Sequence, residues 1–193
     1  MSVPDISLEQ LRRMMAARGV KQLLVKELAA NDNSKNQPYL GGNLDILNIL
    51  PMGEVREETT TRGVSLKAPL PFAWLRPDGG LVDAPNTQLI MYPQYPEIRM
   101  SGFLKGMPRF DDGPNSLMTV REAGRVLFFG ITSDRRIIGW IAGRTSRLAQ
   151  EVHALGELPQ TGVFRHVPMG AADTSRDRLL QKLREIHEYG WLA

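Results

Sequence analysis

A run of seven polar residues separates two apolar segments early in the chain, residues 22–28 and 44–50. The run reads Asn31-Asp32-Asn33-Ser34-Lys35-Asn36-Gln37, and five of its members are Asn, Gln or Lys. Asn and Gln carry paired donors and acceptors that match adenine edges in the major groove of DNA, while Lys matches guanine or a phosphate. A plain solvated loop is the alternative interpretation, because Asn, Asp and Ser are ordinary loop residues.

A second segment, residues 92–105, also combines polar and aromatic side chains. Pro93 and Pro96 bar a regular central strand through its first part, since proline cannot donate a hydrogen bond to a neighbouring strand. Its side chains that donate, accept or stack are Tyr92, Gln94, Tyr95, Glu97, Arg99, Ser101 and Lys105. Two shaped polar loops on one scaffold favour contact with both walls of a major groove. A structural corner in which Tyr packs on Pro is the alternative.

Constellations of catalytic residues are scarce. A metal-dependent nuclease places an acidic residue two positions before a lysine, so that carboxylate and ammonium emerge on one strand face. None of the six lysines has such a neighbour, and the nearest variant is Glu97-Ile98-Arg99, with arginine in place of lysine. We therefore predict no catalytic residue in this segment.

Metal-ligand patterns are equally weak. The histidines are far apart and lack ligand spacing: His153, His166 and His187. Two acidic groups are alternatives for a divalent cation, namely the glutamates at 54–58 and the pair Asp111-Asp112, although solvated loop charge explains both. We expect no metal ligand and no cofactor in the chain.

Length and composition indicate one globular domain. The chain has 193 residues, 42% of them hydrophobic, which suits a single domain spanning residues 1–193. Its net charge is +3, and only six of its 24 basic residues are lysine, so arginine predominates. The planar fork of arginine suits phosphates and guanine edges, although a genome-wide bias explains the same excess. Without cysteine or a long apolar run, we expect no disulfide, no membrane span and a cytoplasmic location.

Residue periodicity predicts a mainly β chain with flanking helices. Ser7 and Gln10 form a capping box for a first helix, which Gly19 ends. A last helix is predicted to begin near Thr174. Between the helices, short apolar or alternating runs predict strands at 22–29, 44–50, 61–67, 71–76, 86–92, 97–104, 125–131 and 136–142. Tight turns are predicted at 76–80 and 132–134, and a long connection at 105–124. This spacing favours a closed or partly closed barrel over alternating βα units.

Two stretches of the sequence resemble a known family. Lys26-Glu27-Leu28, followed by the polar run and Tyr39-Leu40-Gly41, resembles the N-terminal part of restriction endonucleases of the MvaI/BcnI type. The stretch Tyr95-Pro96-Glu97-Ile98-Arg99-Met100-Ser101-Gly102-Phe103 resembles the same family. The layout is similar to an effector domain of the EcoRII type, a B3-like DNA-binding pseudobarrel that holds DNA between an N-arm and a C-arm. Residues 31–37 do not match the EcoRII-type loop residue by residue, so no base-by-base roles transfer.

The resemblance implies a function for the chain. It implies sequence-specific binding of double-stranded DNA at a short CCWGG-type site, as the allosteric effector domain of a type IIE restriction endonuclease. The pattern Leu183-x-x-Ile186-x-x-x-Gly190-Trp191 resembles the join that precedes the catalytic domain of the family, so a C-terminal nuclease domain is expected in the same polypeptide. Mg²⁺ is expected for that nuclease domain only, and the protein is expected to be a monomer.

The candidate DNA-binding residues combine the two polar segments with the lysine that precedes the first of them. They are Lys26, Asn31, Asp32, Asn33, Ser34, Lys35, Asn36, Gln37, Tyr92, Gln94, Tyr95, Glu97, Arg99, Ser101 and Lys105. A standalone Mg²⁺-dependent nuclease and a protein-interaction β-domain are the rival functions.

Overall fold

The computed structural model describes residues 5–29, 32, 37–41, 45–61, 63–92, 97–102, 124–156, 158, 165–167 and 169. Three helices and eleven strands lie in this part of the chain, so the protein is mainly β, as predicted. The helices are α1 (Leu8–Ala16), α3 (Asp45–Ile49) and α4 (Arg147–Ala154). The strands are β1 (Val20–Leu28), β2 (Tyr39–Gly41), β3 (Arg56–Thr60), β4 (Gly63–Pro69), β5 (Phe72–Leu75), β6 (Leu81–Asp83), β7 (Gln88–Tyr92), β8 (Glu97–Ser101), β9 (Arg125–Thr132), β10 (Ile137–Ala142) and β11 (Arg165–Val167).

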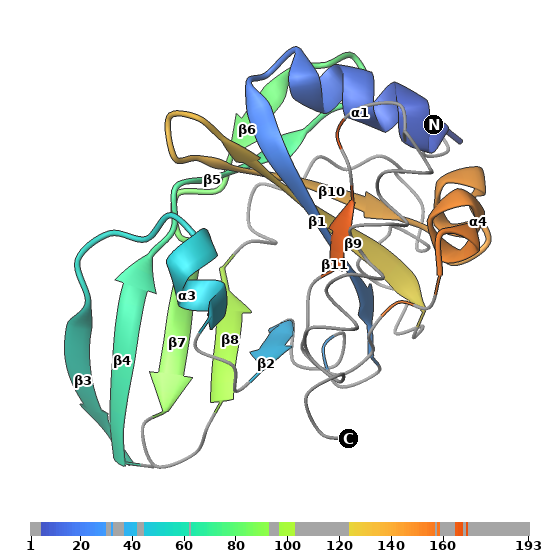
Figure 1. The fold of residues 1–193 in the computed structure, drawn as a ribbon. Helices are drawn as coiled ribbons and strands as arrows, with labels where there is room; N and C mark the ends of the chain where they lie inside the picture. The colour runs from blue at the N-terminus through green and yellow to red at the C-terminus, as the bar shows by residue number, and fades with distance from the viewer. Residues whose placement is uncertain are drawn as a thin grey trace, which may run out of the picture.

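The described strands form two sheets rather than a closed barrel (Figure 1). The first sheet has the order β11-β1-β9-β10-β5-β6, and its pairs are antiparallel except for the parallel pair of β10 with β5. The second sheet has the order β2-β8-β7-β4-β3 and is antiparallel throughout. The chain passes from the second sheet into the first after β4 and returns before β7. The two sheets are therefore interleaved in sequence and belong to one folding unit.

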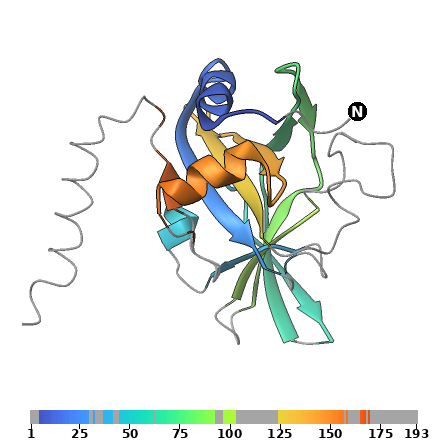
Figure 2. The ribbon, with the colours of Figure 1, turned by 90° about the vertical axis from the view of Figure 1, so that its right-hand side faces the viewer.

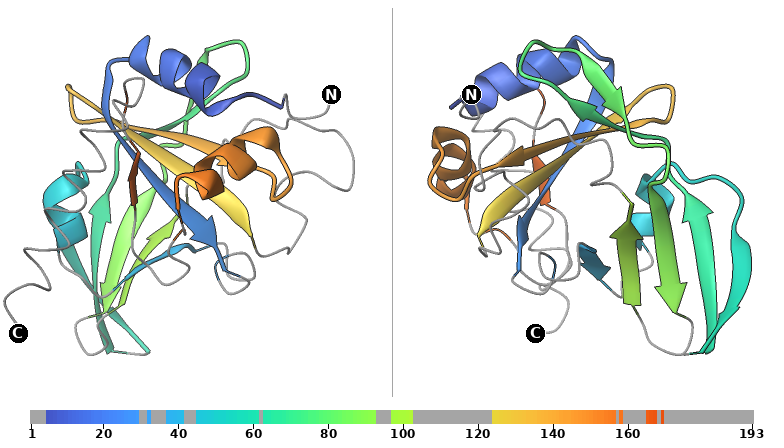
Figure 3. Two further views of the ribbon diagram at one scale, coloured as in Figure 1. Left: turned by 45° about the vertical axis from the view of Figure 1, so that its right-hand side comes forward. Right: turned by 180° about the vertical axis from the view of Figure 1, so that it is seen from behind.

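The first sheet is the middle layer of the molecule. Strand β9 is buried along its whole length, and successive side chains of a strand point to opposite faces. Val126 and Phe128 pack against α1 and α4, whereas Leu127 and Phe129 pack toward the second sheet. Figure 2 shows α4 crossing over β1 and β9, and Figure 3 shows the second sheet projecting away from α1 and α4. A strand covered on both faces has no polar alternation, which explains its continuous apolar sequence.

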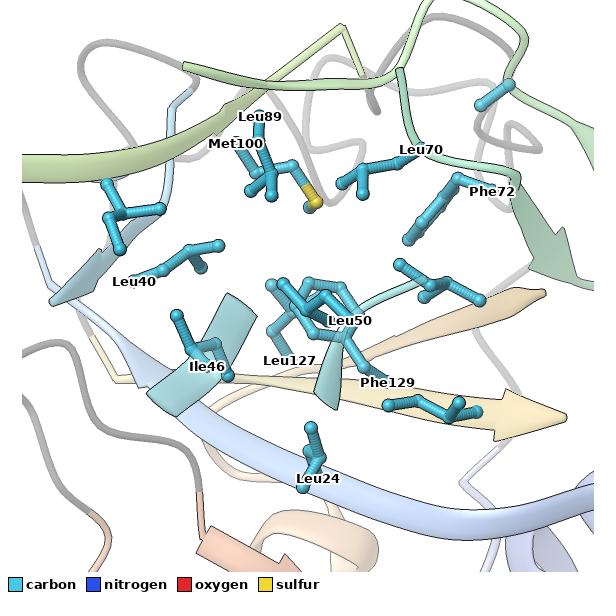
Figure 4. Packing of buried hydrophobic residues seen from close by; sticks show 14 of the residues in the cluster. Leu24, Leu40, Ile46, Leu50, Leu70, Phe72, Leu89, Met100, Leu127 and Phe129 are labelled. Carbon is cyan, nitrogen blue, oxygen red and sulfur yellow. The ribbon is translucent and has the colours of Figure 1, made fainter. Parts of the chain in front are cut away.

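Apolar side chains fill the space between the two sheets (Figure 4). Leu24 and Phe129 come from the first sheet, while Leu89 and Met100 come from the second. Ile46 of α3 and Leu50, which directly follows α3, also belong to this cluster (Figure 4). Burying one such side chain stabilises the fold by about 1.5–3 kcal/mol relative to leaving it in water.

Helix α1 forms as the sequence predicts. The Ser7 hydroxyl oxygen accepts the backbone N–H of Gln10 at 3.1 Å, and the Gln10 side chain accepts the backbone N–H of Ser7 at 2.8 Å. This reciprocal capping box satisfies two of the donors that a helix leaves unpaired at its start. Leu11 and Met15 are fully buried on the face that contacts the first sheet. Gly19 follows the helix with φ of 76°, a left-handed conformation that favours glycine.

The predicted strand at 44–50 is wrong, because Asp45–Ile49 forms helix α3. The run Leu-Asp-Ile-Leu-Asn-Ile-Leu is apolar at positions 44, 46, 47, 49 and 50, and so short an apolar run does not by itself distinguish a strand from a helix. Burial of Ile46 and Leu50, four residues apart, decides for the helical period. In the described part of the chain, no helix is both long and apolar enough to cross a membrane. The predicted last helix and the connection at 105–123 lie outside the described residues.

Candidate nucleic-acid interface

One carboxylate joins the residues on either side of the polar run 31–37, which is called the Asn-rich segment from here on. Asp32 is 3% exposed, and its Oδ2 accepts the backbone N–H of Ala29 at 2.9 Å. Its Oδ1 accepts the backbone N–H of Tyr39 at 2.7 Å. Ala29 follows the end of β1, and Tyr39 begins β2. The Asp32 side chain thus joins the end of β1 to the beginning of β2, and this junction is called the loop base.

Lys26 completes this base from inside the core. Its side chain is fully buried, and its ammonium donates to Asp32 Oδ2 at 2.9 Å and to the backbone carbonyl of Tyr39. Burial lowers the pKa of Lys26, and the neighbouring Arg99 charge acts in the same direction, whereas the Asp32 carboxylate opposes the shift. The predicted DNA contact of Lys26 and Asp32 is corrected by this geometry. Both side chains lie below the surface and bind each other and the backbone.

Strand pairing joins the Asn-rich segment to the second predicted segment. Tyr39 of β2 lies opposite Arg99 of β8, and the backbone N–H of Met100 donates to the carbonyl of Pro38 at 3.1 Å. Because the strands are antiparallel, Pro38 lies toward the Ser101 end of β8, and Gly41 lies toward its Glu97 end. The base of the Asn-rich loop is therefore a neighbour of the last residues of β8.

The segment 92–105 is not one continuous loop. Residues 97–101 form β8, as predicted for a strand at 97–104, and β8 pairs with both β7 and β2. Ser101 lies about 13 Å along the strand from Glu97. The connection between β7 and β8 therefore leaves the sheet at the Glu97 end. The Asn-rich loop base and the chain that follows Ser101 share the opposite end.

Arg99 is the most constrained cation of this region. Its side chain is 14% exposed and pairs with Glu97, with Nε and Oε2 3.0 Å apart. Its guanidinium also lies over the Tyr39 ring, 5.6 Å from the ring centroid, which is the geometry of a cation–π contact. Stacking and ion pairing fix the direction in which the guanidinium points. A fixed fork loses less rotamer freedom when it binds a phosphate or a guanine edge.

A row of five cross-strand neighbours, called the cation row because three of them are cations, crosses the outer face of the second sheet, with the buried Ile90 in its middle. Directly paired residues in adjacent antiparallel strands lie on the same face. The residues next to the row members in sequence point to the opposite face, and they belong to the core: Leu40, Leu89, Ile98 and Met100. The row itself therefore faces away from the core. The row runs from β2 to β3 in the order Tyr39, Arg99, Ile90, Lys67 and Arg56. Across five strands it spans about 19 Å, more than the roughly 12 Å width of a major groove.

Polar residues flank this row on the same face. Gln88 lies opposite Ser101, and Tyr92 lies opposite Glu97, each two residue pairs along the strands from the pair of Ile90 and Arg99. On the other side, Lys67 forms an ion pair with Glu58, whose side chain is 52% exposed. We define the polar face as these side chains together with the row. It consists of Tyr39, Arg56, Glu58, Lys67, Gln88, Ile90, Tyr92, Glu97, Arg99 and Ser101.

The structure places only part of the predicted site. Four predicted residues, Tyr92, Glu97, Arg99 and Ser101, lie on the polar face. Gln37 is half-buried at the loop base, where its backbone N–H donates to the carbonyl of Asp32 at 3.2 Å. The remaining predicted residues lie outside the described residues. They are Asn31, Asn33, Ser34, Lys35, Asn36, Gln94, Tyr95 and Lys105.

Six residues of the face are not among the predicted DNA contacts, namely Tyr39, Arg56, Glu58, Lys67, Gln88 and Ile90. Tyr39 was visible in the stretch that carries the family resemblance, directly after the polar run. Arg56 belongs to β3, whose sequence Arg-Glu-Glu-Thr-Thr has no apolar residue and gives no strand signal. Without β3 and its register, the alignment of Arg56 with Lys67 and Arg99 cannot be predicted.

Two acidic side chains of the polar face lie in ion pairs. Glu97 pairs with Arg99, and Glu58 pairs with Lys67. Among the described residues, no three His, Asp or Glu side chains lie close enough to hold a metal ion. His153 of α4 lies 3.5 Å from Glu27 of β1. The pair Asp111-Asp112 lies outside the described residues.

Comparisons with protein families, with curated proteins and with solved structures found no match. The grounds for a function are therefore the geometry of the polar face and the two sequence stretches that resemble the restriction endonuclease family.

Proposed function

We propose that this chain binds double-stranded DNA in a sequence-specific manner, with the polar face and the Asn-rich loop as its contact surface. The pairing of Tyr39 with Arg99 is the observation that carries the proposal. It makes the base of the Asn-rich loop and the cation row parts of one surface, although 60 residues separate them in sequence. A loop that was only a solvated connection would not need this juxtaposition.

The two parts of the surface suit different tasks. Arg56, Lys67 and Arg99 offer positive charge over a length that suits contacts to phosphates along the walls of a groove. Such contacts fix the register of the protein on the duplex but carry no sequence information. The amides of the Asn-rich loop and the Glu97 carboxylate match base edges, since carboxylates accept from cytosine and amides bind adenine. This division agrees with a C/G-rich site that contains an A·T pair.

The family resemblance extends the proposal to a biological role. In this role the chain is the B3-like effector domain of a cytoplasmic type IIE restriction endonuclease, and its site is of the CCWGG type. Binding of one copy of the site by this domain then biases a nuclease domain in the same polypeptide. The two described sheets, bridged at one corner by the Lys26 side chain, are compatible with a partly open pseudobarrel.

A titration tests the proposed function. The chain is titrated with a CCWGG-type duplex and with a scrambled duplex of equal length, with and without Mg²⁺. We expect a dissociation constant on the order of 10⁻⁸ M or somewhat weaker for the first duplex, and clearly weaker binding of the second. We expect no cleavage of either duplex with Mg²⁺.

Each rival function gives a different result in the same titration. Specific nicking that disappears in Glu97→Ala or Asp111→Ala supports the standalone nuclease. Absence of binding to every duplex supports a protein-interaction domain. Equal binding to both duplexes contradicts sequence-specific recognition.

A further inference from the structure

We propose that Lys26 and Asp32 are positioning residues, which bridge the two sheets and hold Ala29 and Tyr39, on either side of the Asn-rich segment, in the arrangement that binds DNA. The role of the bridge in binding DNA rests on the proposed function, but the bridge itself can be tested without DNA. The bridge is defined as the two side chains together with the backbone of Ala29 and Tyr39.

The bridge joins β1 of the first sheet to β2 of the second sheet. Lys26 projects from the inner face of β1, the same face as Leu24 and Leu28, into the core between the sheets. Its ammonium reaches the backbone carbonyl of Tyr39 in β2, the edge strand of the second sheet. Asp32 accepts the Tyr39 backbone N–H, so both backbone polar groups of Tyr39 are satisfied by these two side chains.

An apolar pair of the same size could not perform this role. Replacing a buried ion pair with apolar residues is often neutral for stability, so stability alone does not explain why the pair is present. The Asp32 carboxylate, however, satisfies the buried donors of Ala29 and Tyr39, and an unsatisfied buried donor is costly. The pair therefore specifies which residues meet at the loop base, and it fixes a single register there.

A fixed loop base reduces the cost of binding. Ordering a flexible segment on a ligand consumes part of the interaction free energy, and a segment whose ends are already fixed loses less freedom. The bridge ties Ala29 to Tyr39 across the Asn-rich segment. It also sets Tyr39 under the guanidinium of Arg99. Loss of the bridge is therefore expected to weaken recognition of the correct site more than attraction to DNA in general.

Three variants of the full chain test the bridge. Lys26→Met keeps the length of the side chain without its charge, Asp32→Asn keeps the shape of the carboxylate, and a double variant combines the two changes. Lys21→Met is the matched control, because Lys21 is an exposed lysine on the same strand. Ile138→Val controls for general destabilisation, since Ile138 is buried on the helix side of the first sheet, away from the bridge.

Hydrogen exchange and DNA binding are measured on every variant. In both single variants we expect the backbone amides of Ala29 and Tyr39 to exchange at least about tenfold faster, while the β10 amides keep their protection. Preference for a CCWGG-type duplex over a scrambled duplex is expected to fall at least about tenfold, with non-specific binding changed less than about threefold. Both controls are expected to leave the Tyr39 amide and the preference unchanged.

Each contrary outcome has a definite meaning. Unchanged exchange at Ala29 and Tyr39 overturns the bridge, and faster exchange with unchanged preference overturns its positioning role. If the β10 amides also lose protection in Lys26→Met, that variant has unfolded, and Asp32→Asn decides by the same criteria. If the unmodified chain does not prefer either duplex, the proposed function fails by itself. The exchange rates then still decide whether the bridge holds the loop base.

Discussion

Arg99 is the residue at which the candidate interface is most tightly organised. Its guanidinium pairs with Glu97 and stacks over Tyr39. It also lies close enough to Lys26 to contribute to the lowered pKa of that lysine. Arg→Lys keeps the charge but loses the planar fork that stacks and bonds in two directions. Arg99 therefore tests whether geometry or charge alone matters for binding.

Replacing Arg99 with alanine is expected to cost about 1–3 kcal/mol on the correct DNA site, and much less on a scrambled duplex. Arg99→Lys is expected to recover the non-specific part of the affinity but not the discrimination. The measurement is a pair of duplex titrations for each variant, with circular dichroism to verify the fold. Arg13→Ala is the control, because Arg13 pairs with Glu9 on the exposed side of α1, far from the polar face. Equal discrimination by Arg99→Ala and the unmodified chain would contradict a base-reading or register-fixing role.

At this scale, the sequence predicted candidate DNA contacts by residue type but not which of them are buried. Asp32 belongs to the polar run and Lys26 lies in the apolar segment before it, and both were predicted to contact DNA like the polar residues of the run. Their burial depends on Tyr39, whose backbone they satisfy, and on the packing of β1 against the second sheet. These are contacts across 7 and 13 positions of the chain that no local pattern encodes.

Among the elements, the contact between α1 and α4 depends on one carboxylate. Glu151 of α4 accepts the backbone N–H of Leu8, at the start of α1, at 2.6 Å, and its other oxygen pairs with Arg147. The Leu8 N–H and the nearby Arg147 hold the pKa of Glu151 below its ordinary value, against the opposing effect of partial burial. Glu151 thus acts as a second cap for α1, supplied by another helix.

This cap is expected to make stability depend on pH. A carboxylate with a lowered pKa in the folded state contributes stability above its unfolded pKa, and the contribution is lost as pH falls through the folded value. We expect Glu151→Gln to lower the unfolding free energy by about 1 kcal/mol near pH 7, as losses of helix caps do. The difference between variant and unmodified chain should shrink as the pH is lowered to about 3. Thermal unfolding at several pH values measures it, and a difference that is constant across this range would contradict the assignment.

The end of β8 requires a glycine. Gly102 has φ of 77°, and a Cβ at this position would lie 2.0 Å from the carbonyl oxygen of Asn86. Gly102→Ala is expected to destabilise the fold by at least about 2 kcal/mol, from the left-handed conformation and the backbone clash together. Gly143→Ala is the matched control, because a Cβ there would meet no atom within 4 Å. Chemical denaturation of both variants measures the difference, and similar midpoints would contradict this account.

Sequence patterns located the long elements and missed the short polar ones. The capping box of α1 and the apolar runs of β1, β9 and β10 are strong signals, and all four elements lie where they were predicted. Strands β3 and β11 and helix α4 lack such runs. These elements form because of the elements they contact: β3 pairs with β4, β11 pairs with β1, and α4 packs on the first sheet. The pairing of β2 with β8, which defines the interface, likewise follows from tertiary packing and not from the three residues of β2.

The molecule as a whole carries its cations in more than one region. Arg56 and Lys67 lie on the polar face of the second sheet, whereas Arg18 and Lys21 lie between α1 and the beginning of β1. Lys21 precedes Lys26 by five residues along β1, which is about 16 Å and twice the Debye length of about 8 Å at physiological salt. Charges at that distance act weakly on a duplex bound at the polar face. The position of a cation, rather than its contribution to net charge, should therefore decide its effect.

Two double variants separate position from net charge. Arg56→Gln with Lys67→Gln, and Arg18→Gln with Lys21→Gln, each remove two positive charges from a chain whose net charge is +3. If the polar face contacts phosphates, the first double variant should weaken binding to all duplexes about equally and reduce the slope of log affinity against log salt by about one to two. The second should leave both the affinity and the slope almost unchanged. Titrations at four or more salt concentrations measure the slopes. Equal effects of the two double variants would show that attraction depends on overall charge, and a larger effect of the second would move the DNA-binding surface to the α1 side of the molecule.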